Sequence, residues 1–160
     1  MADRLNRYWQ QFLASLPAGT DPPAGFVEPA VFGFIREDAT EISKLVLEGV
    51  KTATGSVLWS YQVDGKALPR IGDFWIVVDG DHNPVCVIRT SSVEIIPYSQ
   101  VGEEYAHWGG EGDRTLESWR RMYWQYICQE CERIGRQPTT DAPLIMERFE
   151  VVFSDPPMSG

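Results

Sequence analysis

The sequence predicts a single α+β domain in which short strands are interrupted by helices. The chain has 160 residues, 43% of them hydrophobic, which is enough for one substantial core and short for two domains. Apolar residues recur at helical intervals in three segments, whereas other apolar runs are short and continuous, as in buried strands. These segments do not alternate regularly, so the sequence does not favour a doubly wound parallel sheet.

Two helices are predicted in the first third of the chain. Apolar residues spaced three and four apart form one face of the first helix, which Pro17 ends. The second helix is expected to start at Asp38, because Asp38 and Glu41 have the spacing of a capping box. Gly49 can take the left-handed conformation that closes a helix, so residues 51–59 should be extended. The apolar residues of the first helix are Leu5, Tyr8, Trp9, Phe12, Leu13 and Leu16.

The middle of the chain is expected to form antiparallel strands. Residues 63–66 and 79–84 have the composition of turns, since they are rich in Asp, Gly, Asn and Pro. Between and after them, residues 74–78 and 85–93 are apolar enough for buried strands.

The sequence of the last third of the chain predicts one long helix and one strand. Residues 115–134 carry an apolar face, Glu117 lies near the positive start of the helix, and Gly135 follows its end. Residues 144–153 then supply a final strand.

Charge and cysteine content narrow the classes of partner. The formal net charge is −9, with 14 basic residues against 23 acidic ones, whereas long nucleic acids are usually bound by Lys and Arg. A small, weakly charged ligand therefore fits better than a polymer. The three cysteines are too few for a secreted disulfide scaffold, and the N-terminus lacks the order of a signal peptide. We expect a cytoplasmic protein with reduced thiols and no membrane partner.

Two polar stretches beside glycines hold the candidate chemistry, residues 49–54 and 109–115. Together with two further blocks in the same order, they resemble the pattern of the activating-signal-cointegrator homology (ASCH) family. The blocks are LVLEGVKTATGS at 45–56, LPRIGD at 68–73, GEGDRTLESW at 110–119 and ERFEVV at 147–152.

The resemblance implies a fold similar to the RNA-binding barrel of pseudouridine synthases and archaeosine transglycosylases (PUA-like), a mixed or antiparallel β-barrel flanked by helices. On this basis residues 21–154 are expected to form the ASCH domain. Residues 1–20 form an N-terminal helix extension outside it, and residues 155–160 a flexible tail.

The resemblance also implies an activity. Some small bacterial members are amidohydrolases that deacylate N(4)-acetylcytidine and related cytosines, others are reported as ribonucleases, and others are regarded as RNA-binding modules. The amidohydrolases use a lysine, a threonine three residues later and a later glutamate, which fall on Lys51, Thr54 and Glu111. Asp113 competes with Glu111 for the acidic role. Either residue could instead cap the long helix, and capping is the preferred interpretation for Asp113. No metal or other cofactor is expected.

Amide hydrolysis assigns a task to each of these groups. Thr54 would attack the acyl carbon or orient water, while Glu111 would carry a proton to the departing nitrogen. Lys51 can act as a base only if its surroundings lower its pKa, and it could instead be a solvated lysine past a helix end. Residues three apart on a regular strand face opposite ways, so we expect irregular backbone between Lys51 and Thr54.

Four further residues are candidates for substrate binding: Ser56, Trp59, Trp108 and Arg114. The tryptophans could stack on a base, although most aromatic residues belong to the core. The preferred partner is a small acylated nucleoside. RNA is the alternative, with the chain as a ribonuclease or an RNA-binding domain, and a protein-interaction module that uses the first helix is a third possibility.

Overall fold

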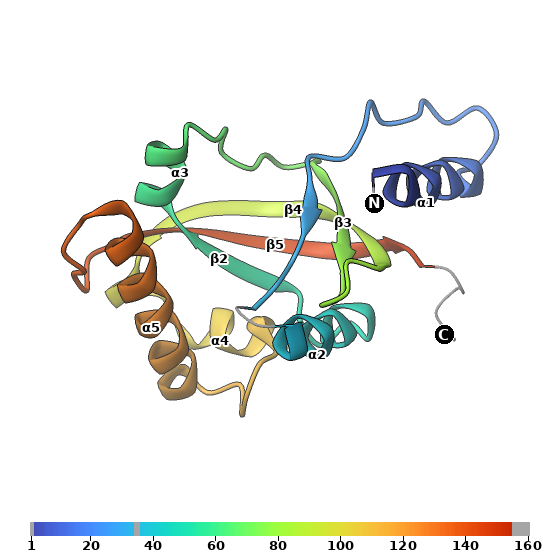
Figure 1. Ribbon diagram of the computed structural model, residues 1–160. Helices are drawn as coiled ribbons and strands as arrows, with labels where there is room; N and C mark the ends of the chain where they lie inside the picture. Colours follow the sequence, from blue (N-terminus) through green and yellow to red (C-terminus); the bar gives the residue numbers. More distant parts are fainter. Residues whose placement is uncertain (1, 34–35, 155–160) are drawn as a thin grey trace. The chain divides into compact units, whose positions relative to one another are not determined.

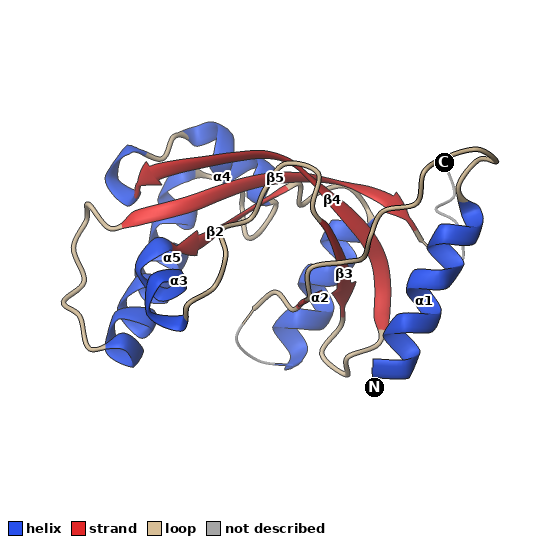
Figure 2. Ribbon diagram, turned by 90° about the horizontal axis from the view of Figure 1, so that it is seen from above, coloured by secondary structure: helices blue, strands red, loops and turns tan. Residues whose placement is uncertain are grey.

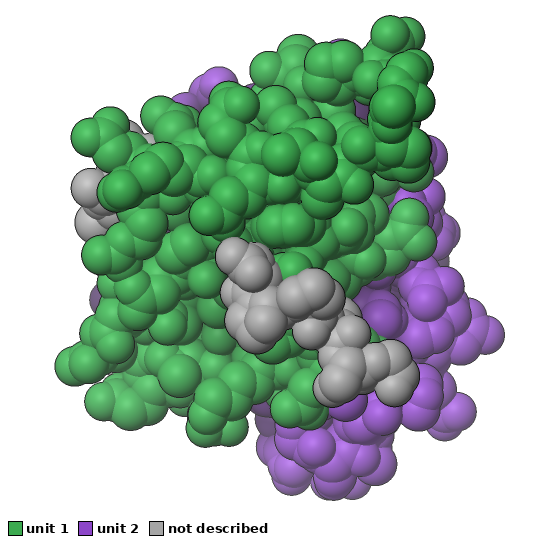
Figure 3. Space-filling view, turned by 90° about the vertical axis from the view of Figure 1, so that its right-hand side faces the viewer, with its two compact units in different colours: residues 1–49, 72–90, 150–160 green, residues 50–71, 91–149 purple. Residues whose placement is uncertain are grey.

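The computed structural model describes residues 2–33 and 36–154 (Figure 1). The predicted flexible tail, 155–160, lies outside these residues. The chain forms two compact units, each assembled from separate stretches of sequence (Figure 3). Unit 1 comprises residues 1–49, 72–90 and 150–160, and unit 2 comprises residues 50–71 and 91–149.

The strands form one mixed sheet in the order β1-β3-β4-β5-β2. The pair β1–β3 is parallel, whereas β3–β4 and β2–β5 are antiparallel, so the predicted α+β class is confirmed. The barrel is not closed, since the described residues leave β1 and β2 as the two edges of the sheet. Closure requires the edge strands to pair, and β1 has only two residues to offer. The strands are β1 (Pro29–Ala30), β2 (Ala53–Val57), β3 (Phe74–Val78), β4 (Pro84–Pro97) and β5 (Pro143–Phe153).

Within the described residues, five α-helices accompany the sheet, and three of them match the predicted ones. They are α1 (Ala2–Ser15), α2 (Arg36–Leu47), α3 (Leu58–Asp64), α4 (Glu103–Gly109) and α5 (Leu116–Ile134). The predicted start of the second helix is wrong, because Asp38 lies inside the first turn of α2 and therefore does not cap it. No helix among residues 2–33 and 36–154 is long and apolar enough to cross a membrane.

Two helices and one strand were not predicted. The extended segment ends at Val57, and the chain then turns into α3, which Gly65 closes in the left-handed conformation. Neither α3 nor α4 exceeds seven residues, which is too short for the apolar period to identify a helix. The strand β1 is shorter still.

The core of unit 1 is built by α1 together with β3 and β4, and Figure 2 shows α1 beside these strands. The predicted apolar face of α1 is buried, with Phe12 only 2% exposed. The aromatic rings of α1 pack against the rings of Phe26, Phe74 and Phe153, with ring centroids 5.3–5.8 Å apart. The first helix is therefore part of the core of unit 1, which argues against its use as a free docking element.

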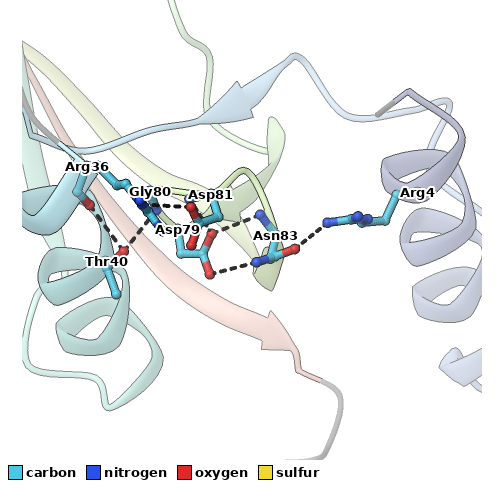
Figure 4. A network of polar contacts seen from close by, with 7 residues as sticks. All are labelled: Arg4, Arg36, Thr40, Asp79, Gly80, Asp81 and Asn83. Atoms are coloured by element: carbon cyan, nitrogen blue, oxygen red, sulfur yellow. Dashed lines mark hydrogen bonds and ion pairs between the residues drawn. The ribbon is translucent and has the colours of Figure 1, made fainter.

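The predicted turn between β3 and β4 is held by a polar network within unit 1 (Figure 4). The carboxylate of Asp79 accepts hydrogen bonds from the backbone N–H groups of Asp81 and Asn83, each at 2.9 Å. Arg36 of α2 pairs with Asp81 at 2.7 Å, and Arg4 of α1 donates to Asn83. The turn thus ties both helices of unit 1 to the β3–β4 hairpin.

The core of unit 2 lies among β2, α3, α4 and α5, whose arrangement is drawn in Figure 1. Both α3 and α4 contact β2 and α5. The helix α5 runs from its N-cap Thr115 to the C-cap Gly135, as the sequence predicts. Its buried residues Trp119, Ile127 and Cys131 belong to the same core cluster as Ala53 and Val57 of β2. The start of β2 and the loop after α4 meet in this unit, and they carry the candidate site.

Candidate active site

Lys51 lies immediately before β2, in a segment without regular secondary structure. The next residue, Thr52, is held on two sides: its N–H donates to the Trp108 carbonyl at 2.7 Å, and its carbonyl accepts from the Phe149 N–H at 3.0 Å. The Lys51 side chain is 1% exposed. The alternative of a solvated lysine past a helix end is therefore wrong, and the regular strand begins only after Lys51.

The ammonium group of Lys51 binds the loop that follows α4. Its Nζ donates to Glu111 Oε2 at 2.9 Å and to the Gly109 carbonyl at 3.3 Å. The Glu111 side chain is 24% exposed, so the ion pair has one buried end and one end that reaches solvent. Two residues 60 positions apart in the chain are thus brought together, and both are predicted site residues.

A glycine permits this close approach. Gly110 has a φ of +72°, in the left-handed region that favours glycine. A Cβ atom there would lie 2.7 Å from the Val50 carbonyl oxygen and 2.8 Å from the Lys51 Cα. The loop can therefore lie against the Lys51 backbone only because this position has no side chain.

Thr54 is joined to the same neighbourhood by Tyr123 of α5. The Tyr123 hydroxyl accepts a hydrogen bond from the Gly55 N–H at 3.0 Å and is also hydrogen-bonded to the Thr54 side chain. Burial raises the pKa of Tyr123 above its usual value, and the negative charge of Glu111 raises it further. Tyr123 therefore contacts β2 at Gly55 and responds to the charge of Glu111.

A second carboxylate adjoins this cluster. Glu147 of β5 pairs with Thr54 in the strand register and is 6% exposed. Its charge also raises the pKa of Tyr123, although less than burial and Glu111 do. The cluster therefore contains Lys51, Thr54, Glu111, Tyr123 and Glu147. Only the first three have a predicted chemical role.

Both predicted aromatic platforms have one face covered by arginine. The guanidinium of Arg136 lies 3.7 Å from the ring centroid of Trp59, and that of Arg148 lies 3.7 Å from the ring centroid of Trp108. Such cation–π stacks leave at most the opposite face for a base. Arg148 Nε is buried and makes no hydrogen bond within the described part of the chain.

Arg114 and Ser56 are placed differently from the catalytic candidates. Arg114, itself at a φ of +64°, donates from Nε to the His107 carbonyl at 2.9 Å and from Nη2 to the Val50 carbonyl at 3.5 Å. Its guanidinium thus fastens the loop after α4 to the segment before Lys51. Ser56 is half-buried in β2, opposite Ile145.

Asp113 serves the start of α5. Its Oδ1 accepts hydrogen bonds from the Thr115 hydroxyl at 2.6 Å and the Thr115 N–H at 3.0 Å, and these bonds lower the pKa of Asp113. Thr115 in turn accepts from the Ser118 N–H at 3.2 Å, as an N-cap does. Asp113 therefore holds the N-cap residue Thr115 in place, and Glu111 is the acidic partner of Lys51.

The cap leads to a stability prediction. Replacing Thr115 with alanine removes the acceptor of the Ser118 N–H, so the free energy of unfolding should fall by about 0.5–2 kcal/mol. Urea denaturation followed by circular dichroism measures the change. Thr139→Ala, at an exposed loop position that caps no helix, is the matched control and should change the free energy much less. Equal losses in both variants would contradict the capping role.

The fold and the site define an α+β domain in which a buried lysine before a strand pairs with a partly exposed glutamate of a glycine loop. The family model of the ASCH domain matches residues 28–153, and the chain belongs to this family. No functionally curated protein matches the chain.

Solved structures agree with this assignment. The ASCH domain from Lactobacillus crispatus JV V101 is 29% identical, with a TM-score of 0.89 over 95% of this chain and 96% of that one. A protein from Enterococcus faecalis V583 is 31% identical, with a TM-score of 0.83 over 95% and 90%. A hypothetical protein with 15% identity and a TM-score of 0.51, covering 78% of this chain and 97% of that one, shares the fold alone.

Proposed function

We propose that this ASCH domain is an amidohydrolase that removes the N4-acyl group of acylated cytidine or cytosine nucleosides. The observation that carries the proposal is the ion pair of Lys51, 1% exposed, with Glu111 at 2.9 Å. Burying a lysine is costly unless it is paired, and here the pair reaches solvent only through Glu111. The lysine and glutamate are also the two residues that the family's amidohydrolases use at these positions.

The three groups divide the reaction between them. The Thr54 hydroxyl, or a water that it orients, attacks the acyl carbon and forms a tetrahedral intermediate. Lys51 and Glu111 are joined by a hydrogen bond, and the carboxylate of this pair can accept the proton of the attacking hydroxyl. Glu111, the partly exposed member, passes a proton to N4 as the C–N bond breaks. If water attacks, the products are cytidine and a carboxylic acid. If Thr54 attacks, cytidine leaves an acyl ester on the Thr54 oxygen, and a water molecule then hydrolyses this ester to release the carboxylic acid and restore the hydroxyl.

The charge of the protein favours a nucleoside over a polymer. The net charge is −9, and the cationic Lys51 is already paired with a carboxylate. An RNA strand would need several exposed cations along its phosphates. A neutral acylated nucleoside meets no such requirement.

Ultraviolet-monitored hydrolysis of N(4)-acetylcytidine tests the proposal. The purified protein should release cytidine, and Glu111→Gln should lower kcat by roughly 10²-fold, since the amide cannot exchange a proton with Lys51 or N4. Glu117→Gln is the matched control, because the Glu117 side chain is 84% exposed on α5, and it should retain full activity.

Two results would contradict the proposal. One is an absence of turnover by the wild-type protein on acetylated and longer acylated cytidines. The other is a kcat of Glu111→Gln equal to that of Glu117→Gln. Salt-sensitive retention or cleavage of RNA by the wild-type protein, without amide hydrolysis, would replace the proposal with the RNA-directed alternative.

A further inference from the structure

The outer edge of β2 is covered by two tyrosines of α5. Because β2 is an edge strand, one row of its backbone groups has no neighbouring strand in the part of the chain that the structure describes. The Gly55 N–H in that strand donates to the Tyr123 hydroxyl at 3.0 Å, and the Val57 backbone is hydrogen-bonded to Tyr126. The two tyrosines are three residues apart on α5, and their backbone partners are two residues apart on β2. Each tyrosine therefore makes the same kind of contact, between its hydroxyl and the backbone of the edge strand.

Only one of these tyrosines adjoins the candidate catalytic groups. Tyr123 is hydrogen-bonded to the Thr54 side chain, and the negative charges of Glu111 and Glu147 raise its pKa. Tyr126 has instead Glu130 as its charged neighbour. The two residues therefore share their backbone role and differ in their relation to Thr54.

Packing fixes the position of the Tyr123 ring. The ring stacks on Trp119 at a centroid distance of 4.3 Å and an interplanar angle of 21°, and it meets Tyr126 edge-on at 6.0 Å. On its other side, a Cβ at Gly55 would lie 3.0 Å from Tyr123 Cε1. The phenol oxygen is thus held both by its ring and by the Gly55 N–H.

We propose that Tyr123 is a positioning residue that orients the Thr54 hydroxyl toward the acyl carbon of the substrate, an inference that rests on the proposed amidohydrolase function. A threonine hydroxyl turns with its side-chain torsion, and attack requires the oxygen to be aimed within a narrow range. A phenol has one proton and two acceptor sites, and Gly55 occupies one acceptor site. The phenol proton and its second acceptor site remain for the Thr54 hydroxyl. Because the phenol oxygen is fixed, a hydrogen bond to it selects one orientation of that hydroxyl.

Kinetics of Tyr123→Phe, with Tyr126→Phe as the matched control, test this role on N(4)-acetylcytidine. Each variant keeps its ring and loses one hydroxyl that covers the β2 edge. We expect kcat of Tyr123→Phe to fall about tenfold with KM within twofold of the wild-type value, since only alignment of the attacking oxygen is lost. Tyr126→Phe should keep kcat within twofold.

A second background separates positioning from a general effect on the site. Thr54→Ser keeps the hydroxyl and removes the methyl group that restricts its rotation. If Tyr123 acts through Thr54, then Tyr123→Phe should lower kcat by clearly more than tenfold in the Ser background. An equal fold-change in both backgrounds would overturn the inference, because independent effects multiply.

The remaining outcomes are also decisive. Three outcomes would overturn the positioning role without affecting the proposed function. They are an equal kcat for Tyr123→Phe and Tyr126→Phe, a Tyr123→Phe effect confined to KM, and a Tyr123→Phe protein that no longer folds. A wild-type protein without turnover would overturn the proposed function itself. Protection of the Gly55 amide from hydrogen exchange, lost in Tyr123→Phe and kept in Tyr126→Phe, confirms the contact without reference to activity.

Discussion

Replacing Lys51 with methionine is expected to lower kcat for N(4)-acetylcytidine by about 10³-fold or more, toward the upper end for a general acid–base group. The substitution removes the partner of Glu111 and also the contact with the Gly109 carbonyl, so both proton transfer and the position of the carboxylate are lost. Methionine keeps the length of the lysine stem, which limits the cavity left at this buried position. Steady-state kinetics and thermal unfolding of the same preparation give the result.

Lys44→Met is the matched control for Lys51→Met. Lys44 lies on α2, its side chain is 60% exposed, and its pairing with Glu41 is a surface contact at 3.6 Å. Surface ion pairs contribute little, so this variant should keep its activity and nearly all of its stability. A folded Lys51→Met protein with wild-type kcat would show that the buried pair is structural and that the amide chemistry lies elsewhere.

Gly110→Ala should cause the largest loss of stability among the changes considered. The residue has a φ of +72°, where an L side chain costs about 1–2 kcal/mol, and its new Cβ would press on the backbone at Val50 and Lys51. Forcing atoms into a packed site costs roughly 1–3 kcal/mol more. The free energy of unfolding should therefore fall by roughly 2–5 kcal/mol, as measured by chemical denaturation.

The preceding glycine is the natural control for this prediction. Gly109 ends α4, and a Cβ there would lie 3.7 Å from Trp119 Cδ1, which is an ordinary contact. Gly109→Ala should leave the free energy of unfolding within about 1 kcal/mol of the wild-type value. If the two variants lose equal stability, the close approach of residue 110 to the Lys51 backbone does not determine the loop position.

Local sequence signals were sufficient where a segment is long or its end is chemically distinctive. The apolar period identified α1 and α5, and Gly135 marked the end of α5 correctly. The strand at 74–78 was predicted at its observed bounds because a continuous apolar run lies between two turns. The start of α2 was misplaced because the Asp38–Glu41 spacing fits the first turn of a helix as well as a cap.

The candidate site shows the same division. The positions of Lys51, Thr54 and Glu111 were predicted from the order of the family's sequence blocks. Tyr123 could not be found in that way, because it follows the apolar period of α5 and reads as a core residue. Its hydroxyl acquires a role only through its contact with Gly55 and Thr54, which lie 68 and 69 residues away in the chain.

The sequence by itself determined the class of the fold, the family and the residue types available for chemistry, because these depend on local periodicity and on the order of motifs. The tertiary structure decided that Lys51 is buried against Glu111 and that, among the described residues, the sheet remains open at β1 and β2. Each of these outcomes depends on contacts between residues distant in sequence or on which strands pair. No local pattern encodes such contacts, since they follow from how packed elements share space.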